Sequence, residues 1–460
     1  GNPVARTPHL DALAARGTRF AQAYSQHSAC AQSRISMQTG WYPHVAGHRT
    51  LDHLLQPWEP NVFKTLRAAG YYVAWAGIRG DTFAPGVTAE STDFFGYTVR
   101  PSLDAIAASH REAFPPGHRL RHAHYVGCLE DAGLDFDEAA VQTAIQLLGD
   151  GLPEPFVLVL TLFAPHPPFA VAEPWFSLHA RSDMPAPVAG DGKAAFVAAL
   201  RERGELDRLE RADWAEISAT YYGMVSRVDD QLGRVLEALD RAGAAERTVT
   251  CSFTDHGEYL GDYGIVEKWP SGLDDCLLRN PLVIAGPNVG EGVTSAALVE
   301  MIDLVPTWCE LAETDVGHPQ FGQSLVSLLT GEAADHRAAV FSEGGFRLDE
   351  ESQNELRADY PYDLKTGLLH DEPHLVGRAV AIRTNAFAYV YRREEADELY
   401  DRVADPAETR NLAGDAAHAA TVAELRDQVL RWFVETSDVI PQARDPRMEP
   451  ALVQQFLPGA

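Results

Sequence analysis

A cysteine and an arginine one helical turn apart have the spacing of a reactive site. Cys30 ends a run of small and polar residues and begins a helical pattern that includes Arg34. A helix start combines unpaired backbone N–H groups with the positive end of the helix dipole, which favours anions and lowers a thiol pKa. Arg34, four residues on, can point at the same place and add a planar cation. The segment is therefore either a nucleophile beside an anion site or a buried cysteine with a surface arginine nearby.

Two further loops carry polar groups directly after strand-like runs. The apolar run 156–162 leads into a proline-rich loop with His166, and a later strand leads into Asp255 and His256. In open α/β sheets such groups gather at the carboxyl ends of the strands, so we expect these loops to meet the cysteine. A carboxylate next to an imidazole suits a divalent cation, although it can equally be a structural ion pair. Lys268, farther on, is either a site cation or a solvated charge.

The order of predicted elements indicates an α/β fold. The run 156–162 is continuously apolar, as in a parallel strand that is covered on both faces. Strands and helices alternate along the first three quarters of the chain, which predicts a large, mostly parallel sheet flanked by helices. The strands are expected at 18–24, 71–77, 156–162, 248–253, 281–285 and 340–342, and the helices at 7–17, 61–69, 137–148, 213–242 and 304–311.

The pattern changes near residue 376. Short strands at 379–383 and 386–391 flank a turn, and a helix is expected at 421–433. We therefore predict a catalytic α/β domain over residues 1–345, an insertion or linker over 346–375, and a small C-terminal α+β domain with an antiparallel sheet over 376–460.

Composition limits the classes of partner. The 460 residues carry a formal net charge of -28, which argues against nucleic acid or an anionic membrane as a partner. A site for an anionic substrate must then be locally positive. The five cysteines are scattered, so neither a disulfide scaffold nor a zinc–thiolate site is expected. No apolar run is long enough for a bilayer, and no signal peptide begins at Gly1, which favours a cytoplasmic location.

Several segments together resemble a known family. The run at 30–40 resembles the sulfatase signature C-x-P-S-R…T-G, and the other segments match the family's motifs in the same order along the chain. They are Thr7-Pro8-His9-Leu10-Asp11, Pro165-His166-Pro167-Pro168-Phe169, Thr254-Asp255-His256-Gly257-Glu258 with Lys268, and Glu398-Leu399-Tyr400-Asp401. The resemblance implies an alkaline-phosphatase-like fold and a type I sulfatase mechanism.

The resemblance also implies a covalent modification. In that family a formylglycine-generating enzyme oxidises the cysteine to formylglycine, whose hydrate attacks sulfur, and this position corresponds to Cys30. Arg34 would hold the modified side chain. The expected substrate is a small-molecule sulfate ester or a sulfated sugar.

The remaining site residues follow from the same matches. Asp255 and His256 correspond to ligands of one Ca²⁺ or Mg²⁺ ion. Lys268 would bind a sulfate oxygen, and His166 would lie near the leaving-group oxygen and supply a proton. His48 falls roughly where other site residues approach.

The sequence departs from the family pattern in three places. The family's strand ending in two aspartates would lie just before Gly1, so either the sequence is truncated there or the protein has lost that pair. Gln32 replaces the proline of the maturation motif. The strand near residue 75 leads into Arg79 rather than the family's lysine, and Arg79 could replace that lysine if the loop is shifted by one position.

Three readings therefore stay open. The leading one is a sulfatase-family hydrolase acting on a sulfate monoester. The second is a phosphonate or phosphate ester hydrolase with the same fold and nucleophile position. The third is a degenerate member that keeps the fold without catalysis. The sequence leaves the oligomeric state open.

Overall fold

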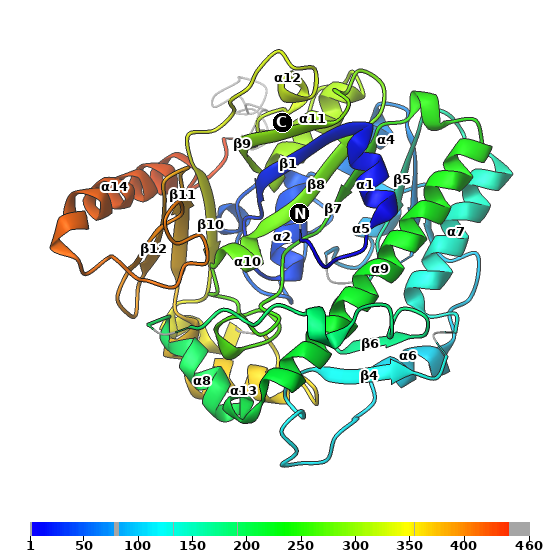
Figure 1. Ribbon diagram of the computed structural model, residues 1–460. Helices are drawn as coiled ribbons and strands as arrows, with labels where there is room; N and C mark the ends of the chain where they lie inside the picture. The colour runs from blue at the N-terminus through cyan, green and yellow to red at the C-terminus, as the bar shows by residue number, and fades with distance from the viewer. Residues whose placement is uncertain (1, 78–81, 132, 191, 354, 441–460) are drawn as a thin grey trace, which may run out of the picture.

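The centre of the molecule is a four-stranded sheet in the order β7–β8–β1–β9 (Figure 1). The computed structural model describes residues 2–77, 82–131, 133–190, 192–353 and 355–440. The strands are β7 (Thr250–Phe253), β8 (Arg279–Ala285), β1 (Gly17–Tyr24) and β9 (Val293–Glu300). β1 pairs in parallel with β9, whereas β8 is antiparallel to both β1 and β7. No crossover helix joins β7 to β8, so β8 returns antiparallel and the sheet is mixed.

A second sheet is fully parallel, with the order β3–β2–β5. Its strands are β3 (Phe94–Gly96), β2 (Tyr72–Ala76) and β5 (Phe156–Leu160). A smaller parallel pair joins β4 (Tyr125–Leu129) to β6 (Phe169–Ala172). The apolar side chains of β5 are half-buried rather than fully buried, because β5 is an edge strand among the described residues and pairs there with β2 alone.

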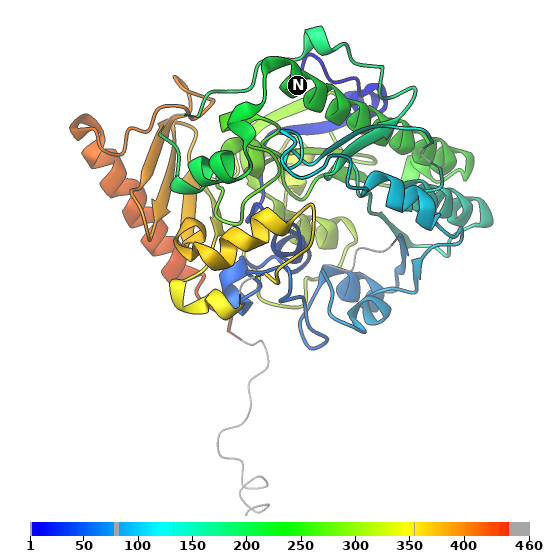
Figure 2. The same cartoon turned by 90° about the horizontal axis from the view of Figure 1, so that it is seen from below.

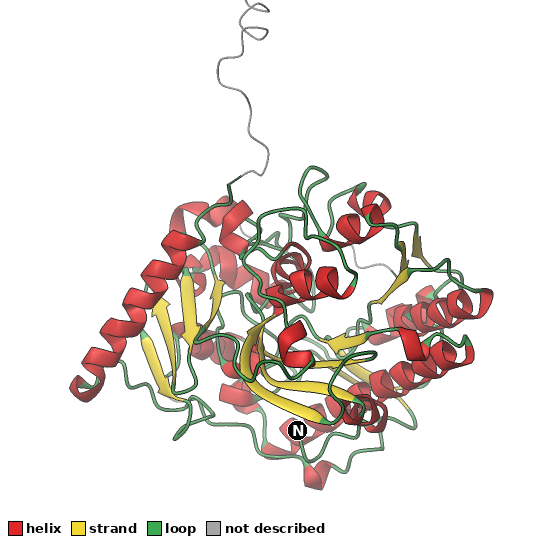
Figure 3. Ribbon diagram, turned by 90° about the horizontal axis from the view of Figure 1, so that it is seen from above, coloured by secondary structure: helices red, strands yellow, loops and turns green. Residues whose placement is uncertain are grey.

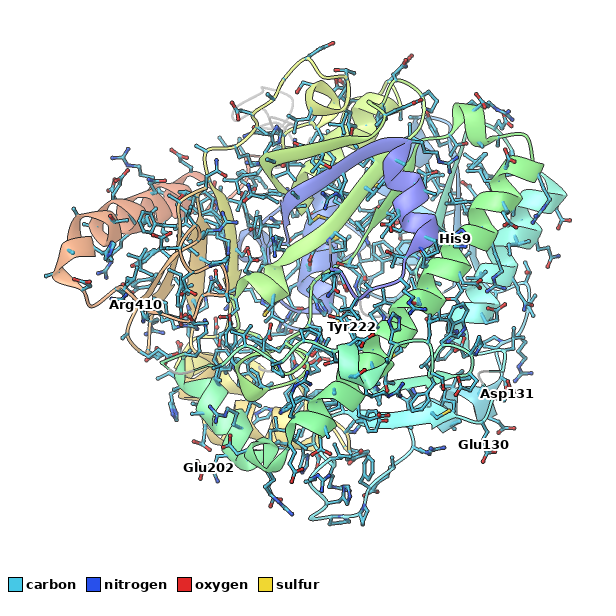
Figure 4. All side chains as sticks on the ribbon, viewed as in Figure 1. His9, Glu130, Asp131, Glu202, Tyr222 and Arg410 are labelled. Atoms are coloured by element: carbon cyan, nitrogen blue, oxygen red, sulfur yellow. The ribbon has the colours of Figure 1, made fainter. Side chains whose placement is uncertain are left out.

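Helices cover these sheets. The long helix α9 (Arg211–Arg241) runs beside α7 (Phe136–Asp150), and α1 (Pro8–Ala15) packs against α9 (Figure 1). A Cβ on Gly233 of α9 would lie 2.4 Å from the ring of His9, so glycine allows the two helices to approach closely; Figure 4 labels His9 at this contact. The other α-helices among the described residues are α2 (Cys30–Thr39), α3 (Pro43–Ala46), α4 (Val62–Ala68), α5 (Val87–Ser91), α6 (Leu103–Ser109), α8 (Ala195–Arg203), α10 (Asp275–Leu278), α11 (Leu304–Leu311), α12 (Val326–Leu329), α13 (Asp363–Asp371) and α14 (Ala419–Glu435).

The C-terminal part is an antiparallel sheet, β10–β11–β12–β13, packed against α14 (Figure 3). Its strands are β10 (Val340–Gly344), β11 (Ala379–Arg383), β12 (Phe387–Arg392) and β13 (Glu398–Asp401). The small antiparallel sheet is confirmed, but the strand expected at 340–342 belongs to it rather than to the α/β sheet. The excursion 345–378 folds back, so that β11 pairs with all five residues of β10. None of the helices in the described ranges is both long and apolar enough to cross a bilayer.

A buried carboxylate in β10 fastens this sheet to the helical layer. Glu343 is fully buried and lies 2.7 Å from His44 Nδ1 and 2.7 Å from an Arg378 guanidinium nitrogen. Burial raises the pKa of Glu343, but Arg378 and His44 outweigh it and hold this pKa well below its usual range. Glu343 therefore stays ionised in the fold.

Glu343→Gln is expected to lower the free energy of unfolding by about 3 kcal/mol at neutral pH, because it leaves the largely buried Arg378 guanidinium without its carboxylate partner. A carboxylate with a depressed folded-state pKa stabilises the fold above its unfolded-state pKa, and this stability is lost as the pH falls. The deficit measured by urea unfolding should therefore shrink by more than about 1 kcal/mol between pH 7 and pH 3. A deficit independent of pH would contradict the assignment. Glu154→Gln, which breaks an exposed pair with Arg247, is the control.

Candidate active site

Two of the predicted loops meet at the start of α2. Cys30 is the first residue of this helix, and every residue of α2 is buried. The Cys30 Sγ lies 3.2 Å from His256 Nε2, which comes from the loop after β7. The convergence that the sequence predicts for these loops is present.

Arg34 joins the same two loops. Its Nε donates to Asp255 Oδ2 at 2.9 Å, and Ser33 Oγ donates to the carbonyl oxygen of Asp255 at 2.6 Å. The guanidinium is about nine-tenths buried. The N-terminal part of α2 therefore fixes the position of the Asp255 carboxylate as well as that of the cysteine.

His166 and Lys268 form a second pair in the cluster. Lys268 Nζ lies 3.3 Å from His166 Nε2, and His166 Nδ1 lies 2.6 Å from the carbonyl oxygen of Pro167. An ammonium can only donate and a carbonyl can only accept, so the imidazole carries its hydrogen on Nδ1 and accepts at Nε2. Burial, and next Lys268, lower the pKa of His166, which keeps it neutral.

The cluster is positive in a strongly acidic chain. Burial raises the pKa of the Cys30 thiol, but Lys268, His256 and Arg34 outweigh it and bring this pKa well below its ordinary value. Burial lowers the pKa of Lys268, but Cys30 and Glu267 outweigh it and hold this pKa well above the usual range. These cations therefore favour an anion at the position of the sulfur. Such a local excess of cations is what an anionic substrate needs in a chain with a net charge of -28.

Three side chains could contribute to a metal site. Ligand atoms of Cys30, Asp255 and His256 all lie within 4.8 Å of one another. His256 Nδ1 is 2.8 Å from the carbonyl oxygen of Gly257, which fixes the ring and turns Nε2 towards the cluster. A carboxylate oxygen and an imidazole nitrogen fit a divalent cation as part of its ligand set.

Two predicted residues are not part of this cluster. The ring nitrogens of His48 bond to the carbonyl oxygen of His53 at 2.8 Å and to Glu59 Oε1 at 3.1 Å, so His48 holds its own loop together. Arg79 lies outside the described residues. Gln32 is buried in the first turn of α2, and its Nε2 donates to the carbonyl oxygen of Arg49 at 3.0 Å.

Sequence reasoning missed a buried acid that supports the histidine loop. The Asp137 carboxylate accepts hydrogen bonds from the backbone nitrogens of Phe163 at 2.5 Å and Ala164 at 2.8 Å, just before His166. In sequence, Asp137 resembles any acidic residue in the first turn of a helix, so no local signal separates it from a surface acid.

Two further residues come from the 346–375 segment, which carries no motif. The ring of Tyr362 lies 6.4 Å from the His166 ring, centroid to centroid. Lys365 Nζ lies 2.5 Å from Glu267 Oε2. The segment predicted as an insertion or linker thus contributes side chains next to the candidate site, while the predicted domain boundaries stay a prediction.

The fold is of the α/β class, and the cluster at the start of α2 gathers several cationic side chains. The sulfatase family model matches residues 1–314 of this chain. The chain belongs to the sulfatase family, whose members include sulfuric ester hydrolases.

Relatives of two kinds resemble the chain over nearly its whole length. The multifunctional alkaline phosphatase superfamily protein PehA of Trinickia caryophylli is 28% identical, covering 95% of this chain and 91% of PehA. The choline-sulfatase of Rhizobium meliloti is 24% identical, and the match covers 94% of this chain and 83% of the choline-sulfatase. The crystal structure of the phosphonate monoester hydrolase of Agrobacterium radiobacter superposes with a TM-score of 0.76 at 23% identity. The match covers 95% of this chain and 92% of that chain. The predicted alkaline-phosphatase-like architecture is consistent with these matches.

Proposed function

We propose that the protein hydrolyses a sulfate monoester with formylglycine, made from Cys30, as its nucleophile. The observation that carries the proposal is the position of Cys30 at the start of α2, where Arg34, His256 and Lys268 surround its sulfur. A small-molecule sulfate ester or a sulfated sugar is the substrate, and a formylglycine-generating enzyme is the maturation partner.

Each side chain of the cluster has a role that follows from its contacts. Arg34 and Lys268 stabilise the charge that develops on sulfate oxygens in the transition state. Lys268 holds a proton at Nζ that it can donate to the leaving-group oxygen. Neutral His166 orients that ammonium by accepting at Nε2. This assigns the proton to Lys268 rather than to the histidine expected from the sequence.

Two groups complete the chemistry. When bound, a Ca²⁺ or Mg²⁺ ion would supply Lewis acidity to the substrate oxygens, and Asp255 and His256 would hold it. The hydrated aldehyde of formylglycine at position 30 would supply a hydroxyl nucleophile.

The test combines mass spectrometry with turnover. Protein from a host that contains a formylglycine-generating enzyme is digested, and the peptide that bears Cys30 is weighed. We expect loss of the sulfur atom from this residue and hydrolysis of 4-nitrophenyl sulfate that EDTA abolishes and Ca²⁺ or Mg²⁺ restores. The modification needs this direct test because Gln32 departs from the maturation motif. An unmodified thiol in active protein would overturn the formylglycine assignment. Absence of turnover in modified, metal-supplied protein would favour a non-catalytic member.

A phosphonate or phosphate ester is the second candidate substrate. The structural match to the phosphonate monoester hydrolase of Agrobacterium radiobacter supports it, as does the absence of the family's lysine after the strand near residue 75, because a diester carries less negative charge. The values of kcat/KM for 4-nitrophenyl sulfate, 4-nitrophenyl phenylphosphonate and bis(4-nitrophenyl) phosphate decide between the two. A higher value for either phosphorus ester would replace the sulfatase assignment.

A further inference from the structure

The segment between β10 and β11 reaches the anion site through one lysine. Lys365 lies in the first turn of α13, and its Nζ is 2.5 Å from Glu267 Oε2. The same segment is attached to the loop after α3, because Arg49 pairs with Glu350 and Asp52 accepts from the backbone nitrogen of Leu356. Figure 2 shows α13, in yellow, beside the blue segment that contains this loop.

Glu267 is shared between two ammonium groups. Its Oε1 pairs with Lys268 Nζ, while its Oε2 accepts from Lys365 Nζ and, at 2.7 Å, from the backbone nitrogen of Lys268. The carboxylate is 2% exposed, and the two lysine side chains are 5% and 12% exposed, so solvent screens these charges little. The backbone of Glu267 has a φ of 66°, and Glu258 accepts from its N–H, which fixes where the carboxylate lies.

The balance of charge explains what the second lysine does. Alone with Lys268, Glu267 would neutralise the cation and draw it away from a substrate. With Lys365 on the other oxygen, the trio carries one net positive charge. Lys268 has three ammonium hydrogens, of which one faces Glu267 and one faces His166, so the third is available to an anion.

We propose that Lys365 is a positioning residue that keeps the Lys268 ammonium aimed at the anionic group of the substrate by sharing Glu267. The inference rests on the proposed role of Lys268 as the cation that binds this group. It makes the 346–375 segment part of the anion site, although Lys365 itself need not touch the substrate.

The first experiment compares Lys365→Gln with Lys365→Arg. We expect Lys365→Gln to raise the KM for 4-nitrophenyl sulfate and the Kd for inorganic phosphate about tenfold, with a smaller change in kcat. Lys365→Arg keeps the charge and should restore most of the affinity. Lys64→Gln is the matched control, because Lys64 pairs with Glu90 on another face and should leave both constants unchanged. If the arginine variant binds phosphate as weakly as the glutamine variant, the proposal is wrong.

The second experiment is a double-mutant cycle with Glu267→Gln. If Lys365 acts by sharing Glu267, then Lys365→Gln should change phosphate affinity less than about twofold once Glu267 is neutral. An undiminished tenfold loss in that background would overturn the proposal. Phosphate affinity is measured by calorimetry and needs no turnover, so it tests Lys365 even if the enzyme fails to hydrolyse sulfate esters. Should Glu267→Gln not fold, the arginine comparison decides.

Discussion

Cys30→Ala is expected to lower kcat/KM for the preferred ester by at least about a thousandfold, because the variant lacks the side chain from which the proposed formylglycine nucleophile is made. The sulfur lies at the start of α2, where Lys268, His256 and Arg34 favour an anion. Truncation to alanine leaves these cations and the helix in place, so the variant should still bind inorganic phosphate.

The control for this variant is another cysteine. Cys128 is exposed in β4, outside the cluster around Cys30, so Cys128→Ala should keep full activity. Activity that survives in Cys30→Ala would show that Cys30 is not the nucleophile. Loss of phosphate binding in Cys30→Ala would show instead that the alanine disturbed the helix start.

Lys268→Met is expected to reduce kcat/KM by about a hundredfold to a thousandfold. The ammonium lies 3.3 Å from His166 Nε2 and is held protonated in a buried site, so its loss removes both a charge facing the substrate oxygens and the proton available to the leaving group. Methionine has a similar length and preserves the packing. Glu267, the partner of Lys268, still pairs with Lys365 in this variant, which limits the loss of folding stability.

The dependence on the leaving group separates the two roles of Lys268. If it supplies a proton, the defect in kcat should be larger for an alkyl sulfate than for 4-nitrophenyl sulfate, whose leaving group needs no proton. An equal defect for both would assign Lys268 to charge stabilisation alone. Lys64→Met, measured in parallel, should match the parent protein.

Local signals predicted most of the elements. The long helix expected at 213–242 is observed as α9, and the helix expected at 304–311 is α11. Their apolar periodicity arises because one face of each helix must be buried, and this constraint is visible in a short window of sequence. Strand directions were less predictable, since β8 follows β7 without a crossover helix and the sheet became mixed.

The sequence by itself determined which segments of the chain form the site. Cys30 at a helix start, Arg34 one turn on, and Asp255 and His256 after a strand are local arrangements, and the fold brings them together at distances of 2.9 and 3.2 Å. The motifs at these positions also identified the family, which the comparison over residues 1–314 confirmed.

Only the tertiary structure decided how the site is supported and charged. Asp137, Glu267 and Lys365 lie in three separate segments, and their burial and pairing depend on contacts between residues up to 98 positions apart. An acid or a lysine in a helical first turn looks the same in sequence whether it faces solvent or a buried partner. His48 was predicted near the site from its position in the sequence, and in the fold its ring nitrogens bond to His53 and Glu59. Composition and periodicity report which side chains prefer burial, but the partner of a buried charge is set by how distant segments pack.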